Sequence, residues 1–405
     1  MPELESFPQE VKDQLTSVGS ADVVIGFTSF KATDDLSWAA GLAQDGLNVL
    51  IAYPGGGDVI EFQPIAGVQF LHYPASTPER YLNAPKNIFG SFQEVLQIAQ
   101  RLASKSCCVW NSAPQLASAD IIESLIKPVL DQNFDLVIPG YTTAKFGALI
   151  NSGIICPLTR ALYGRRIEFP MAVDLGFSPQ LLNRLIQVDP NTRVPRSSQW
   201  ITTEAICAGM QICQTALLME PPRPPDSSDL SSILAAVLGR IFSDLERNAA
   251  FWQRSKGSRS APAFGEPYTK EQDEVAVDVT HLIETFQLGY RNLSEIWGLA
   301  LSPATFLELK KLTKSSTAAF RMGDDLWVRI VYEFALAHRQ RAMNRDHLLR
   351  SMTPLYLSWV ASYTLQMLDV SADGFHHRLE QLALAYENQK PYLLSRWRWP
   401  DRFNP

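Results

Sequence analysis

Polar side chains suited to contacting a diphosphate follow the first apolar run of the chain. Residues 21–30 (ADVVIGFTSF) form a short apolar run that is rich in β-forming residues. Thr28 and the aromatic Phe30 lie at the end of this run, and Lys31 follows it. The carboxyl ends of parallel strands form the ligand-binding edge of an α/β sheet, so these groups are expected at that edge. A lysine there can meet a diphosphate as a point charge. A solvated surface lysine explains Lys31 equally well, and the sequence leaves both interpretations open.

A lone carboxylate, Asp174, lies within the otherwise apolar residues 171–177, and three arginines (Arg160, Arg165 and Arg166) precede it. Burying a carboxylate is costly unless it is hydrogen-bonded. Asp174 is therefore either a structural anchor paired with an arginine or a carboxylate that faces a substrate. The general excess of structural ion pairs favours the pairing.

Other familiar catalytic motifs are missing from the sequence. Three glycines at 55–57 close a predicted strand, but they form neither the dinucleotide fingerprint nor a P-loop, and a plain turn is favoured. The six histidines lack the spacing of a zinc site. Ser112 lacks the flanking glycines of an esterase nucleophile. These patterns disfavour Rossmann, P-loop, zinc and esterase chemistry.

Length and composition limit the class of protein. A chain of 405 residues exceeds the size of most single cores, so we expect two domains. The net charge is −6 and no dense run of Lys or Arg occurs, which makes nucleic acid an unexpected partner. Five cysteines without a Cys-x-x-Cys pair indicate a reduced compartment. An acidic N-terminus and the lack of about 18 consecutive apolar residues predict a cytoplasmic protein without a membrane span.

The elements that must position these residues alternate in type over the first half of the chain. Strands are predicted at 21–30, 48–58, 68–74, 107–110 and 135–141, and helices at 34–45, 88–103 and 119–130. This alternation predicts a parallel sheet.

A Pro-rich break at 219–229 ends the alternation. Almost everything from there to 399 has helical periodicity, and its aromatics fall at the spacing of a helical core. We therefore expect an α/β domain over residues 1–228 and an all-α domain over residues 229–405.

Several long stretches resemble one enzyme family. They are residues 140–178, residues 200–214 (WITTEAICAGMQICQ) and residues 324–341 (DDLWVRIVYEFALAHRQR). These stretches resemble the GT-A glycosyltransferases related to mannosylglycerate, glucosylglycerate and glucosyl-3-phosphoglycerate synthases, particularly bacterial relatives of about this length. The resemblance covers nearly the whole chain. It implies a GT-A domain followed by a helical domain that can form a homo-oligomer, a nucleotide-diphosphate sugar as donor, a small-molecule acceptor, and transfer with retention.

The metal site of that family is altered in this sequence. In the family, a divalent cation bridges the donor phosphates and is held by an Asp-x-Asp motif and a later His. Here the motif position has Asn111, Ser112 and Ala113, and Pro221 falls at the position of the His. The ligands for Mg²⁺ or Mn²⁺ are therefore expected to be lost, and no cofactor is implied with certainty.

The resemblance also implies which residues surround the two substrates. Lys31 and Lys86 could take over part of the metal's work on the diphosphate. Asp174 falls in the acceptor-side loop, and Ser198 replaces a family Asp placed near the reacting sugar and the acceptor. The implied donor-side set is Thr28, Phe30, Lys31, Lys86, Asn111 and Ser112. The implied acceptor-side set is Arg165, Ser198 and Trp200, and Asp174 is the implied catalytic residue.

Two functions from different classes remain. The first is a glycosyltransferase that works without a metal. The second is a catalytically silent paralogue that keeps the fold to bind a sugar nucleotide or a protein partner. The missing carboxylates favour the second, whereas the length of the resemblance favours the first.

Overall fold

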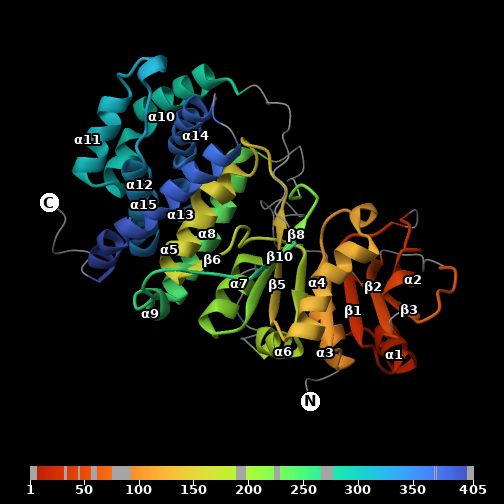
Figure 1. The fold of residues 1–405 in the computed structure, drawn as a ribbon. Coiled ribbons are helices and arrows are strands. Elements are labelled where there is room, and N and C mark those ends of the chain that lie inside the picture. Colours follow the sequence, from red (N-terminus) through yellow and green to blue (C-terminus); the bar gives the residue numbers. More distant parts are fainter. Residues whose placement is uncertain are drawn as a thin grey trace. The chain divides into compact units, whose positions relative to one another are not determined.

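The first of two units is built on an eight-stranded sheet (Figure 1). The structure is a computed structural model, and it describes residues 7–31, 34–43, 46–55, 62–74, 93–187, 198–222, 229–265, 277–368, 370 and 372–398. The strands, in sheet order, are β10 (Ala263–Phe264), β8 (Ile212–Leu217), β5 (Leu136–Tyr141), β7 (Leu175–Phe177), β4 (Ser106–Trp110), β1 (Val23–Phe27), β2 (Val49–Gly55) and β3 (Val68–Pro74).

Short helices connect these strands. They are α1 (Gln9–Val18), α2 (Ala39–Ala43), α3 (Gln93–Arg101), the 3₁₀ turn η2 (Pro114–Leu116), α4 (Ala119–Gln132), α6 (Pro179–Gln187) and α7 (Ser198–Cys207). The Ser118 hydroxyl accepts a hydrogen bond from the amide of Ile121 and so caps α4 at its start. Asn133 ends α4 in a left-handed conformation.

The five predicted strands of the first half are all present, and the five strands pair in parallel where they adjoin one another. Every residue of β1 and of β4 is buried. Continuous apolar runs suit central parallel strands, because helices cover both faces of such a sheet. The prediction of a mixed α/β architecture with an alternating first half is confirmed.

One strand runs against the others. β7 is antiparallel to both β4 and β5, and it lies between them. Its first residues are therefore at the edge where β4 and β5 end. Gly176 makes this insertion possible, because a Cβ atom there would lie 2.0 Å from the carbonyl oxygen of Leu125 in α4. The sequence pattern did not predict this strand of three residues.

The second unit is mainly helical. The contacts assign Thr142–Glu168, Asp226–Ser260 and Tyr268–Pro405 to it, so the chain enters it earlier than the expected boundary after residue 228. Its elements are the π-helical turn η3 (Asn151–Ile155), α5 (Cys156–Tyr163), β6 (Arg165–Arg166), α8 (Leu230–Arg247), α9 (Ala249–Trp252), β9 (Arg259–Ser260), α10 (Val279–Ala300), α11 (Pro303–Leu312), the 3₁₀ turn η4 (Thr317–Ala319), α12 (Asp324–Gln340), α13 (Arg345–Ser351), α14 (Thr353–Met367) and α15 (Ala372–Arg398).

A buried arginine explains why α5 belongs with the helices. The side chain of Arg160 is 5% exposed and pairs with Glu380 and Glu387, both on α15, at 2.5 and 3.1 Å. Separating α5 from α15 would leave the buried guanidinium of Arg160 without a carboxylate partner, which is strongly destabilising. Arg160 is therefore a structural residue of the helical unit.

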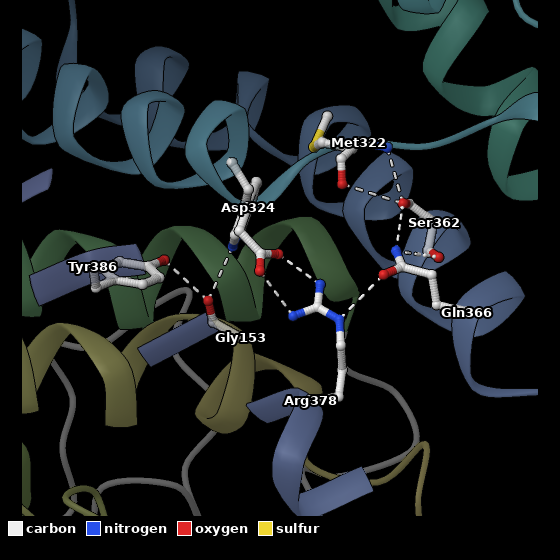
Figure 2. Close-up of polar contacts among 8 residues, drawn as sticks. Gly153, Met322, Asp324, Ser362, Gln366, Arg378 and Tyr386 are labelled. Atoms are coloured by element: carbon white, nitrogen blue, oxygen red, sulfur yellow. Dashed lines mark hydrogen bonds and ion pairs between the residues drawn. The ribbon is translucent and has the colours of Figure 1, made fainter. Parts of the chain in front are cut away.

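Polar contacts also fix η3 among the helices (Figure 2). The carbonyl of Gly153 accepts hydrogen bonds from the Trp327 indole and the Tyr386 hydroxyl, each at 3.0 Å. Arg378 forms two hydrogen bonds with Asp324, at 2.6 and 3.0 Å, and a third with Gln366. These contacts tie η3, α12, α14 and α15 into one body.

The aromatic residues of the helical unit form its core, as predicted. Trp359 stacks on Trp327 and on Tyr363 with ring centroids 5.5 and 5.4 Å apart. Seven aromatics predicted as core are all buried, namely Trp297, Trp327, Tyr332, Phe334, Tyr356, Trp359 and Tyr363. Within the described part of the chain, no helix has the combination of length and hydropathy that crossing a membrane requires.

A buried lysine holds the end of α5 to a loop. Lys390 Nζ donates hydrogen bonds to the carbonyls of Leu162 and Ser255, at 3.2 and 2.8 Å. Burial lowers the pKa of Lys390 to about 8, because desolvation disfavours its charged form.

This shift predicts a pH dependence of stability. Below pH 8, Lys390 is protonated in both the folded and the unfolded chain. Between pH 8 and about 10.5, only the unfolded chain keeps the proton, so the free energy of unfolding gains at most about 1.4 kcal/mol per pH unit from this residue. Chemical denaturation should show the free energy of unfolding of the wild type rising over that pH range relative to that of Lys390→Met. A difference that is constant with pH would contradict the assignment.

Candidate functional site

The candidate site lies where the strand order reverses. β1 pairs in parallel with β2 on one side and with β4 on the other. Ligands of open α/β sheets bind outside the carboxyl ends of strands at such a point. Thr28 and Asn111 are the first residues after β1 and β4, and the Thr28 hydroxyl donates a hydrogen bond to Asn111 Oδ1 at 2.5 Å. The two predicted donor-side residues are therefore neighbours at this edge.

Asp174 holds the turn that follows β4. Its Oδ1 accepts hydrogen bonds from the amides of Asn111 and Ser112, both at 2.8 Å. Its Oδ2 accepts from the Ser112 hydroxyl at 2.6 Å and from the Tyr141 hydroxyl at 2.7 Å. The carboxylate thus joins the ends of β4 and β5 through four hydrogen bonds, and Asn111 and Ser112 take their conformation from it.

The environment of Asp174 differs in one respect from the structural pairing that the sequence favoured. The residue is completely buried, and none of its four described hydrogen bonds comes from an arginine. Burial raises the pKa of the carboxyl, and the four hydrogen bonds oppose this rise without cancelling it. Asp174 is therefore a structural anchor, as the favoured alternative expected, but its partners are hydroxyls and amides. Arg160 binds α15 instead, and Arg165 and Arg166 form β6.

Tyr141 is a site residue that the sequence analysis missed. It ends the predicted strand at 135–141, and its hydroxyl points to Asp174. Burial raises its pKa well above the ordinary value, so the hydroxyl keeps its proton and remains a donor. The signal that could have identified Tyr141 was its hydroxyl, a polar group on the last residue of an otherwise apolar strand.

An aromatic cluster adjoins the Thr28 side of the edge. Phe30 is half-buried, and its ring centroid lies 5.6 Å from that of Phe27, 5.5 Å from that of Tyr53 and 5.9 Å from that of Phe62. Lys31 follows and is exposed, and its amide donates to Asp34 at 2.8 Å. This part of the edge places the half-buried ring of Phe30 next to the exposed Lys31.

The predicted acceptor-side residues do not gather in one place. Ser198 and Trp200 are buried at the start of α7, and the Ser198 hydroxyl donates to the carbonyl of Met171 at 2.9 Å. They support the segment before Asp174 from inside the unit. Arg165 lies on β6 in the helical unit. Lys86, a predicted donor-side residue, lies outside the described residues.

The oxygens at this edge do not fit a divalent cation between two phosphates. Asp174 Oδ1 accepts from two backbone amides, and Asp174 Oδ2 accepts from the Ser112 hydroxyl. Asn111 Oδ1 already accepts from Thr28. Among the described residues, no three His, Cys, Asp or Glu side chains are grouped as metal ligands. Pro221 has no ligand atom in its side chain. The chemistry proposed below therefore uses no step through a metal.

Comparison with known proteins gives weak similarity to solved structures alone. No protein-family model and no curated protein matches the chain. Among solved structures, it is similar to glucosyl-3-phosphoglycerate synthase from Mycobacterium tuberculosis, in complex with Mn²⁺, UDP-glucose and phosphoglyceric acid. The sequences are 16% identical, and the match covers 60% of this chain and 85% of that one with a TM-score of 0.30.

Proposed function

We propose that this protein is a glycosyltransferase that binds a nucleotide-diphosphate sugar at the ends of β1 and β4 and passes the sugar to a small acceptor. The observation that carries the proposal is the Thr28–Asn111 hydrogen bond at the reversal of strand order. The sugar-nucleotide class comes from the sequence resemblance to GT-A enzymes. Self-association through the helical unit belongs to the same proposal.

Each residue of the edge has a role that its environment permits. Asn111 contacts the ribose or a phosphate, since its side chain stands at the end of β4. Phe30 offers an apolar ring for the base. Lys31, together with Lys86, offsets charge on the leaving diphosphate. Asp174 acts as a positioning residue, because it is buried and fixes the turn of Asn111 and Ser112.

A second function is favoured by one observation. The only carboxylate described at the turn after β4 is buried, and it is occupied by four hydrogen bonds. A catalytically silent paralogue that binds a sugar nucleotide or a partner protein would need no accessible carboxylate. Binding without turnover distinguishes this alternative from the enzyme.

The donor site is tested by the Thr28→Val variant, which keeps the shape of the side chain and loses the hydrogen bond to Asn111. We expect the Kd for the preferred nucleotide sugar to rise about fivefold to tenfold, the equivalent of a typical hydrogen bond. Calorimetric titration measures the change. Thr285→Val is the matched control, because the Thr285 hydroxyl bonds only within α10, to the carbonyl of His281. Equal effects of the two substitutions would contradict the placement.

The class of ligand is tested by thermal shift with UDP-, GDP- and ADP-sugars, each with and without Mn²⁺. A ligand that binds the folded chain raises the Tm in proportion to its excess over Kd. Stabilisation followed by turnover that Lys86→Ala abolishes and a chelator does not affect would support the enzyme. Stabilisation without turnover would support the silent paralogue. If no sugar nucleotide stabilises the protein, the proposed donor site is refuted.

A further inference from the structure

Three segments of the helical unit carry only positive charge. Residues 159–167, 248–260 and 388–398 together contain nine Lys and Arg and no Asp or Glu. The whole chain has a net charge of −6, so this concentration is opposite to the overall balance. Positive charges in distant parts of the sequence form a basic surface only if the fold brings those parts together.

The fold does bring the three segments together. β6 pairs in parallel with β9, and Arg165 stands opposite Arg259. Lys390 of α15 joins the other two segments through the carbonyls of Leu162 and Ser255. Near the end of α15, Arg398 donates to the side chain of Gln253 at 3.0 Å.

Seven of the nine cations are at the surface. Arg160 and Lys390 are buried and bonded within the unit. The other seven are half-buried or exposed, and we call them the basic strip: Arg165, Arg166, Arg254, Lys256, Arg259, Arg396 and Arg398.

Part of the basic strip lacks any internal compensation. For the side chains of Arg165, Lys256 and Arg259, the described residues provide no hydrogen bond or ion pair. Arg165 and Arg259 are directly opposite each other on neighbouring strands, where like charges destabilise the pairing. An anion bound across the two guanidinium groups would remove that repulsion.

The uniform sign of the strip identifies the kind of partner. A protein partner would have to present an acidic patch that matches the strip in shape as well as in charge. The charged residues within the three segments are all basic, and the neighbouring acids Glu168 and Glu387 lie just outside them. Single-stranded nucleic acid is held by exposed aromatic rings, but Trp252 and Trp397 of these segments are buried against each other. The two half-buried rings are also in contact within the unit, since Phe251 stacks on Tyr163 and Arg396 lies over Tyr392. An anionic lipid surface requires only a high density of positive charge. We propose that the basic strip docks this protein on anionic phospholipid membranes.

The proposal is tested by co-sedimentation of the full-length protein with phosphatidylcholine vesicles that contain about 30% phosphatidylserine. Each cation near such a surface strengthens binding about fivefold, so Arg165→Gln/Arg259→Gln should weaken partitioning about 25-fold. The binding should also weaken steeply as salt rises from about 0.1 to 0.5 M. Lys310→Gln/Lys311→Gln is the control, because it removes the same charge from exposed positions of α11.

Four results would overturn the proposal. The first is no binding to anionic vesicles at low salt, and the second is equal binding to pure phosphatidylcholine. The third is an equal loss in the control and in the Arg165/Arg259 variant, which would indicate a general charge effect. If an RNA oligonucleotide displaces the protein from vesicles and depends on the same two arginines, the strip binds nucleic acid and the membrane assignment is wrong. Circular dichroism checks that both double variants are folded.

Discussion

The Asp174→Ala variant is expected to lose about 3–5 kcal/mol of its free energy of unfolding. The substitution removes the acceptor of four hydrogen bonds and leaves the amides of Asn111 and Ser112 and the hydroxyl of Tyr141 without it. Buried donors without an acceptor each cost about 1–3 kcal/mol, and the terms add incompletely. Urea denaturation followed by fluorescence measures the loss.

A surface carboxylate provides the comparison. Asp346 is 60% exposed and pairs with Arg350 one turn away on α13. Asp346→Asn should change the free energy of unfolding by less than about 0.5 kcal/mol. At a temperature where the Asp174→Ala variant is folded, this variant should also bind nucleotide sugar more weakly than the wild type does, because the turn of Asn111 has lost its anchor. Wild-type stability in Asp174→Ala would show that the four hydrogen bonds do not hold this edge.

The Gly176→Ala variant should be destabilised by about 3 kcal/mol or more. The new Cβ atom would lie 2.0 Å from the carbonyl oxygen of Leu125 and 3.2 Å from Cβ of Val137. A backbone carbonyl inside α4 cannot rotate aside as a side chain can, so either α4 or β7 must move. Overpacking of this kind usually costs 1–3 kcal/mol and more where the neighbour is rigid. The fall in Tm reports it.

Gly298→Ala is the matched control for this prediction. Gly298 lies on α10, and a Cβ atom there would meet nothing within 4 Å. Alanine favours a helix interior over glycine by up to about 1 kcal/mol, so this variant should be unchanged or slightly more stable. A Gly176→Ala protein as stable as Gly298→Ala would mean that β7 is not packed on α4 as described.

Most of the sheet could be predicted because burial leaves a direct trace in the sequence. β1 and β4 are buried on both faces, so every residue is apolar or small and the run is recognisable. β7 has only Leu175–Phe177, which is too short for periodicity to detect. Its position between β4 and β5 depends on hydrogen bonds to residues far away in the chain.

The division of the chain into units could be predicted only in part. One of several changes between the two units falls after Pro225, within the Pro-rich segment 219–229. Thr142–Glu168 lies within the half predicted as α/β, and no local pattern says which core it joins. That choice follows from the pairing of Arg160 with Glu380 and Glu387, more than 200 residues later.

The sequence by itself singled out Asp174 and favoured a structural anchor over a carboxylate that faces a substrate, because an acid inside an apolar segment is costly to bury without partners. It also placed Thr28 and Asn111 at strand ends. Only the tertiary structure decided which groups compensate the acid. The antiparallel course of β7 brings Asp174 to the ends of β4 and β5, where amides and hydroxyls surround it. Partners at this separation are set by strand order, and strand order is not encoded in any local pattern.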